Sequence, residues 1–216
     1  MARYRGPVCR TCRREAQPLF FKGERCYTMK CPFLKPRKDP RQTLPLPPGK
    51  LPKFRRRPRE YGIQLREKQK VKRLYGLLET QFKNYFRNAE RLHGVTGELL
   101  LSQLERRLDN VVFRLGFASS RRQGRELVAH RHFNINGKAV NIPSYQVREG
   151  DTVEIKAESR SQAFLEHIRS VTSARPVPTW LERDSDQGRG KVLALPRREH
   201  IQEQIDEQQI VNLYSR

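Results

Sequence analysis

Acidic residues and long hydrophobic runs are scarce in this chain. Of its 216 residues, 23 are Asp or Glu, against 45 Lys or Arg, and only 36% are hydrophobic. The N-terminal stretch MARYRGP lacks the apolar run of a secretory signal, and no stretch approaches the length of a membrane span. Neither a lipidation motif nor a basic amphipathic anchor is present. We therefore expect a soluble, cytoplasmic protein with no membrane partner.

A catalytic constellation is also missing. The sequence contains no nucleophile–base arrangement and no phosphate-cradling glycine loop, and DSDQGRGK (184–191) lacks the Walker spacing. The five His residues are scattered, apart from His130 and His132. We therefore expect no enzymatic activity and no small-molecule substrate.

The positive charge is concentrated in one part of the chain. The net charge is +22, and residues 1–60 carry 18 Lys and Arg against 4 Asp and Glu. Residues 161–216 carry 8 of each and are neutral. A field of this size concentrates anionic polymers around the protein, so nucleic acid is the expected partner.

All four cysteines lie within the first 31 residues. Cys9 and Cys12 form a C-x2-C pair, Cys26 and Cys31 form a C-x4-C pair, and 13 residues separate the two pairs. This spacing predicts one structural zinc ion held by four thiolates, with no open position for a substrate. An iron–sulfur cluster is the minor alternative, and disulfides are less expected in a reducing compartment.

Helical periodicity begins after the basic N-terminal segment. Residues 61–92 place apolar side chains on one face at steps of three and four, with a break expected at Gly76. We interpret this stripe as core: Val71, Leu74, Tyr75, Leu78, Phe82, Tyr85 and Phe86. A short helical pattern follows at 163–172, then a strand at GKVLALP and a terminal helix at EQQIVNLYSR.

Residues 96–156 predict two helices followed by a small twisted sheet. Thr96 is expected to cap the first helix, which ends at Gly116, and the second helix is expected to start at Ser120, which has capping-box spacing to Gln123. The dipeptide Asn-Gly within HFNINGKAVNI predicts a hairpin, because both central positions of a type I′ turn need positive φ. Further short strands are expected around the following Gly-Asp turn.

Arginines crowd the start of the second helix. Arg121, Arg122 and Arg125 lie where exposed N–H groups already present positive charge, and this arrangement costs stability unless an anion binds there. Because such a violation of local rules tends to mark a functional site, we interpret these residues as part of a phosphate-binding surface. The candidate nucleic-acid-binding residues are Arg55, Arg56, Arg57, Arg106, Arg107, Asn110, Arg114, Ser120, Arg121, Arg122, Gln123, Arg125, His130, His132, Asn136 and Lys138.

The same segment resembles a known RNA-binding domain. LERRLDNVVFRLGFASSRRQGRELVAHRHFNINGKAV, continued by NIPSYQVREGDTVEI, is similar to the domain named after ribosomal protein S-four. RYRGPVCRTCRRE, KGERCYTMKCP, REKQKVKRLYG, VTGELLL and DEQQIVNLYSR resemble the bacterial S-four family along the rest of the chain, in its four-cysteine form. Two departures are visible: Gly124 stands where the family usually has Ala, and PPGKLPKF replaces a PPGQHG-type turn.

The resemblance implies an α+β fold. A zinc-held N-terminal extension (1–44) would precede a mainly helical domain made of two segments (45–98 and 162–216). An RNA-binding module of two helices and a small twisted β-sheet (99–161) would be inserted between those segments.

The resemblance also implies a role. A member of the family would bind 16S ribosomal RNA at the helix junction of its 5′ domain and nucleate assembly of the small subunit. It would then line the channel by which messenger RNA enters, near the third and fifth small-subunit proteins, and contribute to decoding accuracy. The remaining alternatives are a nucleic-acid chaperone or DNA-binding zinc protein, which would not distinguish structured ribosomal RNA from duplex DNA, and an RNA-modifying enzyme such as a pseudouridine synthase.

Overall fold

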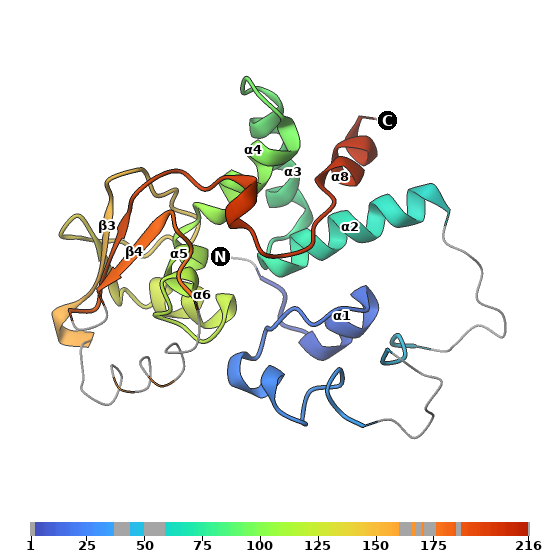
Figure 1. Ribbon diagram of the computed structural model, residues 1–216, viewed down its shortest axis with the longest axis horizontal. Coiled ribbons are helices and arrows are strands. Elements are labelled where there is room, and N and C mark those ends of the chain that lie inside the picture. The colour runs from blue at the N-terminus through green and yellow to red at the C-terminus, as the bar shows by residue number, and fades with distance from the viewer. Residues whose placement is uncertain are drawn as a thin grey trace. The chain divides into compact units, whose positions relative to one another are not determined.

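The computed structural model describes residues 3–36, 44–49, 59–159, 166, 170, 176–184 and 187–215. The chain divides into two units, Met1–Arg87 with Gln204–Arg216, and Asn88–Glu203. The described part of the first unit is helical, and the second combines helices with a five-stranded antiparallel sheet (Figure 1). The α+β class predicted from the sequence is confirmed.

The first unit contains α1 (Val8–Glu15), the 3-10 helix η1 (Gly23–Tyr27), α2 (Glu60–Leu74), α8 (Glu207–Tyr214) and most of α3 (Glu79–Glu90). Gly76, with a φ of 64°, lies at the predicted break between α2 and α3. The predicted stripe is mainly buried core, and α8 packs beside α2 (Figure 1). Tyr214 of α8 stacks on Phe86, with ring centroids 4.4 Å apart.

A buried carboxylate joins α1 to α2. Glu15 pairs with Arg66, at 3.3 Å, and with Arg73. Burial raises the pKa of the Glu15 carboxyl, although both arginines act to lower it. The helix that carries Cys9 and Cys12 is therefore tied to α2 by a charged contact.

The helices of the second unit are α4 (Thr96–Glu105), α5 (Leu108–Arg114) and α6 (Arg121–Ala129). The prediction of one helix from Thr96 to Gly116 is wrong, because Arg107 is extended (φ −63°, ψ 134°) and separates α4 from α5. Arg107 forms an isolated β-bridge with Gln146, and this tertiary pairing replaces helical hydrogen bonds. The expected cap at Thr96 is also wrong, since Val95 is the N-cap residue and its side chain makes no cap hydrogen bond.

The sheet has the strand order β2-β1-β3-β5-β4. Its strands are β1 (Phe133–Ile135), β2 (Lys138–Ala139), β3 (Thr152–Ile155), β4 (Leu181–Asp184) and β5 (Arg189–Val192). Asn136 and Gly137 have φ values of 49° and 78°, which confirms the predicted hairpin. Val153 of β3 faces Gly190 of β5, so the sheet joins the middle segment to strands that the sequence-based division assigns to the helical domain.

The core of the second unit lies between this sheet and the helices α5 and α6. It includes Trp180, which is the only tryptophan of the chain and is 1% exposed. The 3-10 helices η2 (Ala157–Ser159) and η3 (Arg198–His200) complete the unit. The helical pattern predicted at 163–172 lies outside the described residues, apart from residues 166 and 170.

Gly124 allows α6 to approach α5 closely. A Cβ atom at this position would lie 2.7 Å from the backbone oxygen of Asp109. Helix propensity alone predicts that Gly124→Ala would stabilise the protein by about 1 kcal/mol. We instead expect a loss of about 1–3 kcal/mol in the free energy of unfolding, because the two helices must move apart. Urea unfolding followed by Trp180 fluorescence would measure this, and a stabilised variant would contradict the expectation.

Candidate nucleic-acid interface

Asp109 lies at the centre of a buried ion-pair cluster where α5 meets α6. Arg107 donates from Nε to Oδ1 at 3.1 Å and from Nη2 to Oδ2 at 2.8 Å. Arg125 of α6 donates from Nε to Oδ2 at 2.8 Å. Arg107 is 2% exposed, so this carboxylate compensates a buried positive charge. Asp109 therefore ties the start of α5 to α6.

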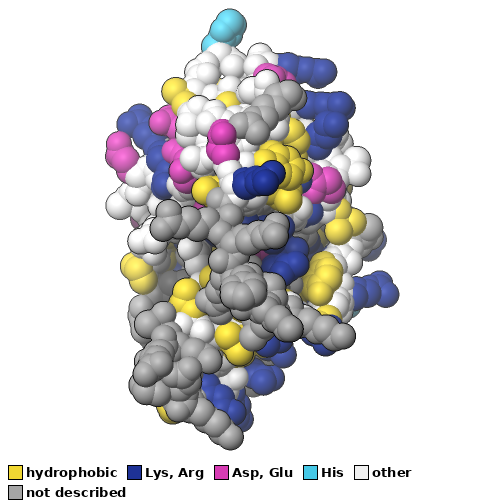
Figure 2. Space-filling model, turned by 90° about the vertical axis from the view of Figure 1, so that its right-hand side faces the viewer, with side chains coloured by type: hydrophobic (Ala, Val, Ile, Leu, Met, Phe, Trp, Pro, Cys, Tyr) yellow, Lys and Arg dark blue, Asp and Glu magenta, His cyan; other side chains and the backbone are white. Residues whose placement is uncertain are grey.

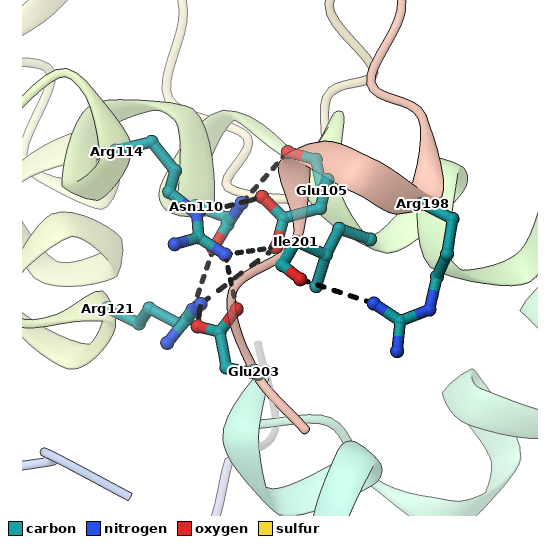
Figure 3. Close-up of polar contacts among 7 residues, drawn as sticks. All are labelled: Glu105, Asn110, Arg114, Arg121, Arg198, Ile201 and Glu203. Atoms are coloured by element: carbon teal, nitrogen blue, oxygen red, sulfur yellow. Dashed lines mark hydrogen bonds and ion pairs between the residues drawn. The ribbon is translucent and has the colours of Figure 1, made fainter. Parts of the chain in front are cut away.

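A second cluster links α4, α5, α6 and the segment after η3 (Figure 3). Arg114 donates two hydrogen bonds to Glu105, at 2.9 and 2.8 Å, and one to Glu203, at 2.7 Å. Arg121 donates to Asn110 Oδ1 at 2.7 Å and to Glu203 Oε1 at 2.5 Å. We call the residues Glu105, Asn110, Arg114, Arg121 and Glu203 the Glu203 cluster.

The arginines keep both carboxylates of the Glu203 cluster ionised. Burial raises the pKa of Glu203, but Arg121 and Arg114 outweigh burial and lower the pKa to about 2. Burial also raises the pKa of Glu105, but the arginines, chiefly Arg114, outweigh burial and lower this pKa as well. Both groups therefore carry their negative charge at neutral pH.

These clusters change the interpretation of the arginines at the start of α6. Arg121 and Arg125 do not present uncompensated charge at the helix N-terminus, because each has a carboxylate partner. Likewise Asn110 and Arg114, which are also candidate nucleic-acid-binding residues, are buried. Sequence reasoning missed Glu105, Asp109 and Glu203. Glu105 directly precedes Arg106, and Asp109 follows Arg107 by two residues, so both could have been considered as partners. No neighbouring residue in the sequence points to Glu203.

Ser120 and Gln123 act at the start of α6. Ser120 Oγ accepts from the Gln123 N–H at 3.2 Å, which confirms the predicted N-cap. Gln123 Oε1 accepts from both the N–H and the hydroxyl of Ser119, at 2.6 Å each. In a capping box the Gln123 side chain would accept from the N–H of Ser120, but here it accepts from Ser119 instead. Ser120 and Gln123 therefore both have structural roles.

Other candidates are more accessible. His130, Asn136 and Lys138 are exposed. Arg122 is partly exposed, and its Nε lies 3.9 Å from Glu126 Oε1, which is a long ion pair. Asn136 nevertheless also holds the hairpin, because its Nδ2 donates to Asp151 Oδ1 at 2.9 Å. His132 is half-buried, with Nδ1 2.8 Å from Ser159 Oγ. The candidates Arg55, Arg56 and Arg57 lie outside the described residues.

The structure adds two exposed arginines that sequence reasoning did not select, Arg131 and Arg148. Arg106 Nε donates to the Val147 carbonyl at 3.0 Å, so the Arg106 side chain lies beside the residue that precedes Arg148. Burial lowers the pKa of Arg106, and the charge of Arg148 lowers it further, although Asp151 acts to raise it. Two neighbouring positive charges favour an anion beside them. Figure 2 shows Lys and Arg side chains at several separate places on the face in view.

The four cysteines converge without forming disulfides. All four line one cavity, together with basic residues that include Lys22, Arg25 and Lys30. Burial, with smaller contributions from the other three cysteines, raises the pKa of Cys12 to about 11. Within the described residues, however, no group of three or more His, Cys, Asp or Glu side chains is arranged to hold a metal ion. The thiols are thus gathered at one place, and a zinc-held extension is not established.

Comparison with known proteins agrees with the resemblance over the full chain. The family "Ribosomal protein S4/S9 N-terminal domain" matches residues 3–105, and the "S4 domain" matches residues 106–153. The chain is 56% identical to the "Small ribosomal subunit protein uS4" of Caldicellulosiruptor saccharolyticus and 55% identical to that of Geobacter sulfurreducens. It is 53% identical to "Small ribosomal subunit protein uS4A" of Symbiobacterium thermophilum. Each alignment covers 216 residues and the whole of both chains. Among the described residues, the structure contains no helix with the length and apolar composition needed to span a membrane.

The full-length similarity to uS4 proteins shows the family. The chain belongs to the uS4 family of small-subunit ribosomal proteins, a family of structural proteins and not of enzymes.

Proposed function

We propose that this protein binds 16S ribosomal RNA at the helix junction of its 5′ domain and nucleates assembly of the small ribosomal subunit in the cytoplasm. In the finished subunit it would lie beside the channel through which messenger RNA enters, near the third and fifth small-subunit proteins. It would contribute there to decoding accuracy. Full-length similarity to uS4 proteins supports this function.

The observation that carries the proposal is the accessible positive charge in the second unit. Arg106 donates to the carbonyl of Val147, next to the exposed Arg148, and Arg122, His130 and Lys138 are exposed or partly exposed. Structured RNA is bound mainly through phosphates, 2′-hydroxyls and shape, which suits such side chains. We assign direct RNA contacts to these residues and to Arg55, Arg56 and Arg57. The buried candidates, Arg107, Asn110, Arg114 and Arg125, would chiefly shape the surface in the unbound protein.

The test is binding to naked 16S 5′-domain RNA, with unrelated RNA of equal length and duplex DNA as competitors at moderate salt. We expect the 5′-domain RNA to resist both competitors. Replacing Lys138 and Arg148 together by Gln should weaken binding and reduce the slope of log K against log salt by about 2.

The matched control is Lys83→Gln with Arg87→Gln, which removes two exposed charges from α3. Equal losses for the two double variants would show that net charge alone matters. Equal binding of all three nucleic acids would favour a general polyanion-binding chaperone.

We further propose that Cys9, Cys12, Cys26 and Cys31 hold one structural zinc ion. Their common cavity, their lack of disulfides and their spacing support this, and the lining Lys and Arg residues would offset the charge of four thiolates. Zinc would supply folding free energy to a segment that is poor in apolar residues. An iron–sulfur cluster remains the alternative.

We retain the predicted division as a proposal for the folding units: extension 1–44, helical segments 45–98 and 162–216, and RNA-binding module 99–161. The pairing of β5 with β3 suggests that the module also requires residues 181–192 to complete its sheet.

A further inference from the structure

Glu203 is the outer of two carboxylates that contact the same pair of arginines. Glu105 is 1% exposed and lies beneath the arginines, whereas the Glu203 side chain is 24% exposed. Glu203 reaches both guanidinium groups, with Oε2 at 2.7 Å from Arg114 and Oε1 at 2.5 Å from Arg121 (Figure 3). Its carboxylate thus bridges two converging donors in the way a bound anion would.

Of the two carboxylates, Glu203 is the one that reaches both arginines closely. Arg114 has two hydrogen bonds to Glu105, but Arg121 lies 3.9 Å from the nearest Glu105 oxygen. The hydrogen bond from Arg121 Nε to Asn110 goes to a neutral group. Removing the charge of Glu203 would take one carboxylate partner away from both arginines, which are largely buried. Loss of a carboxylate beside largely buried arginines is costly unless another anion takes its place.

The segment that carries Glu203 has anchors of its own. Ile201 is buried, and its carbonyl accepts from Arg198 Nη1 at 3.2 Å (Figure 3). The 3-10 helix η3 also packs against α4. The Glu203 side chain can therefore leave the arginines by rotation while the backbone stays in place.

We propose that Arg114 and Arg121 form a binding site for a phosphodiester group of RNA, which Glu203 occupies until RNA displaces it. Arginine pairs bind phosphate oxygens with the same donor geometry that they offer a carboxylate. Glu203 acts as an intramolecular competitor that weakens the binding of anions. The choice of RNA as the source of the phosphate rests on the proposed function.

The experiment compares Glu203→Gln with Glu199→Gln in the full-length protein. Glu199 lies on η3 and is exposed, so both variants lose one negative charge from the same segment. Titration with inorganic phosphate should show about tenfold tighter binding for Glu203→Gln than for Glu199→Gln. Trp180 fluorescence reports whether each variant is folded. Glu203→Asp, which keeps the charge but shortens its reach, provides a second folded variant and should give an intermediate affinity.

A second titration uses 16S 5′-domain RNA. Glu203→Gln should bind this RNA more tightly than Glu199→Gln, with a salt slope steeper by about one phosphate contact. Equal phosphate affinity of the two variants would overturn the site, and a phosphate effect without an RNA effect would overturn its assignment to RNA. If the wild-type protein fails to prefer the 5′-domain RNA over duplex DNA, the proposed function fails instead, whatever the phosphate titration shows.

Discussion

Replacing Asp109 by Asn is expected to lower the free energy of unfolding of the second unit by about 3–5 kcal/mol. Asn retains the shape of Asp but carries no charge. Arg107 and Arg125 would then remain buried without the carboxylate that both of them contact.

Urea unfolding followed by Trp180 fluorescence measures this effect directly, because the single tryptophan belongs to the core of the same unit. The control is Glu149→Gln, which removes an exposed carboxylate and should change the free energy of unfolding by less than about 0.5 kcal/mol. If Asp109→Asn were as stable as this control, the Asp109 ion pairs would contribute nothing to folding.

Replacing Cys9 and Cys12 together by Ser is expected to abolish stoichiometric zinc and to unfold the cysteine segment, residues 9–31. Serine hydroxyls are poor zinc ligands at neutral pH, and two thiolates cannot complete a closed tetrahedral site. In zinc-finger peptides, metal binding supplies about 10–16 kcal/mol, so little would hold a segment that depends on the metal. The second unit should remain folded, with unchanged Trp180 emission.

Metal analysis of purified protein measures the zinc content, and limited proteolysis reports order within residues 9–31. The control is Met29→Ser, which alters an exposed side chain in the same segment and leaves the four thiols intact. A double variant that still binds one zinc ion would refute the ligand assignment. Visible absorption by an iron–sulfur cluster in the wild-type protein would refute zinc as the metal.

The sequence alone was sufficient for features that depend on neighbouring residues. The Asn136-Gly137 hairpin, the break at Gly76 and the Ser120 cap follow from backbone conformations and side-chain bonds that span a few residues. The terminal helix, predicted at EQQIVNLYSR, is α8. The family could also be recognised from local motifs, and the comparisons agree.

The tertiary structure decided which charged residues are accessible. Arg114, Arg121 and Arg125 look like surface residues in the sequence, but carboxylates 9, 82 and 16 residues away pair with them. Gly124 looks like a weak helix residue until its close approach to Asp109 is seen. In the same way, β5 pairs with β3 across more than thirty residues of intervening chain. Charge, periodicity and turn chemistry are local properties that the sequence displays directly. The partner of a buried charge is chosen by the packing of the whole unit, so only the folded chain identifies it.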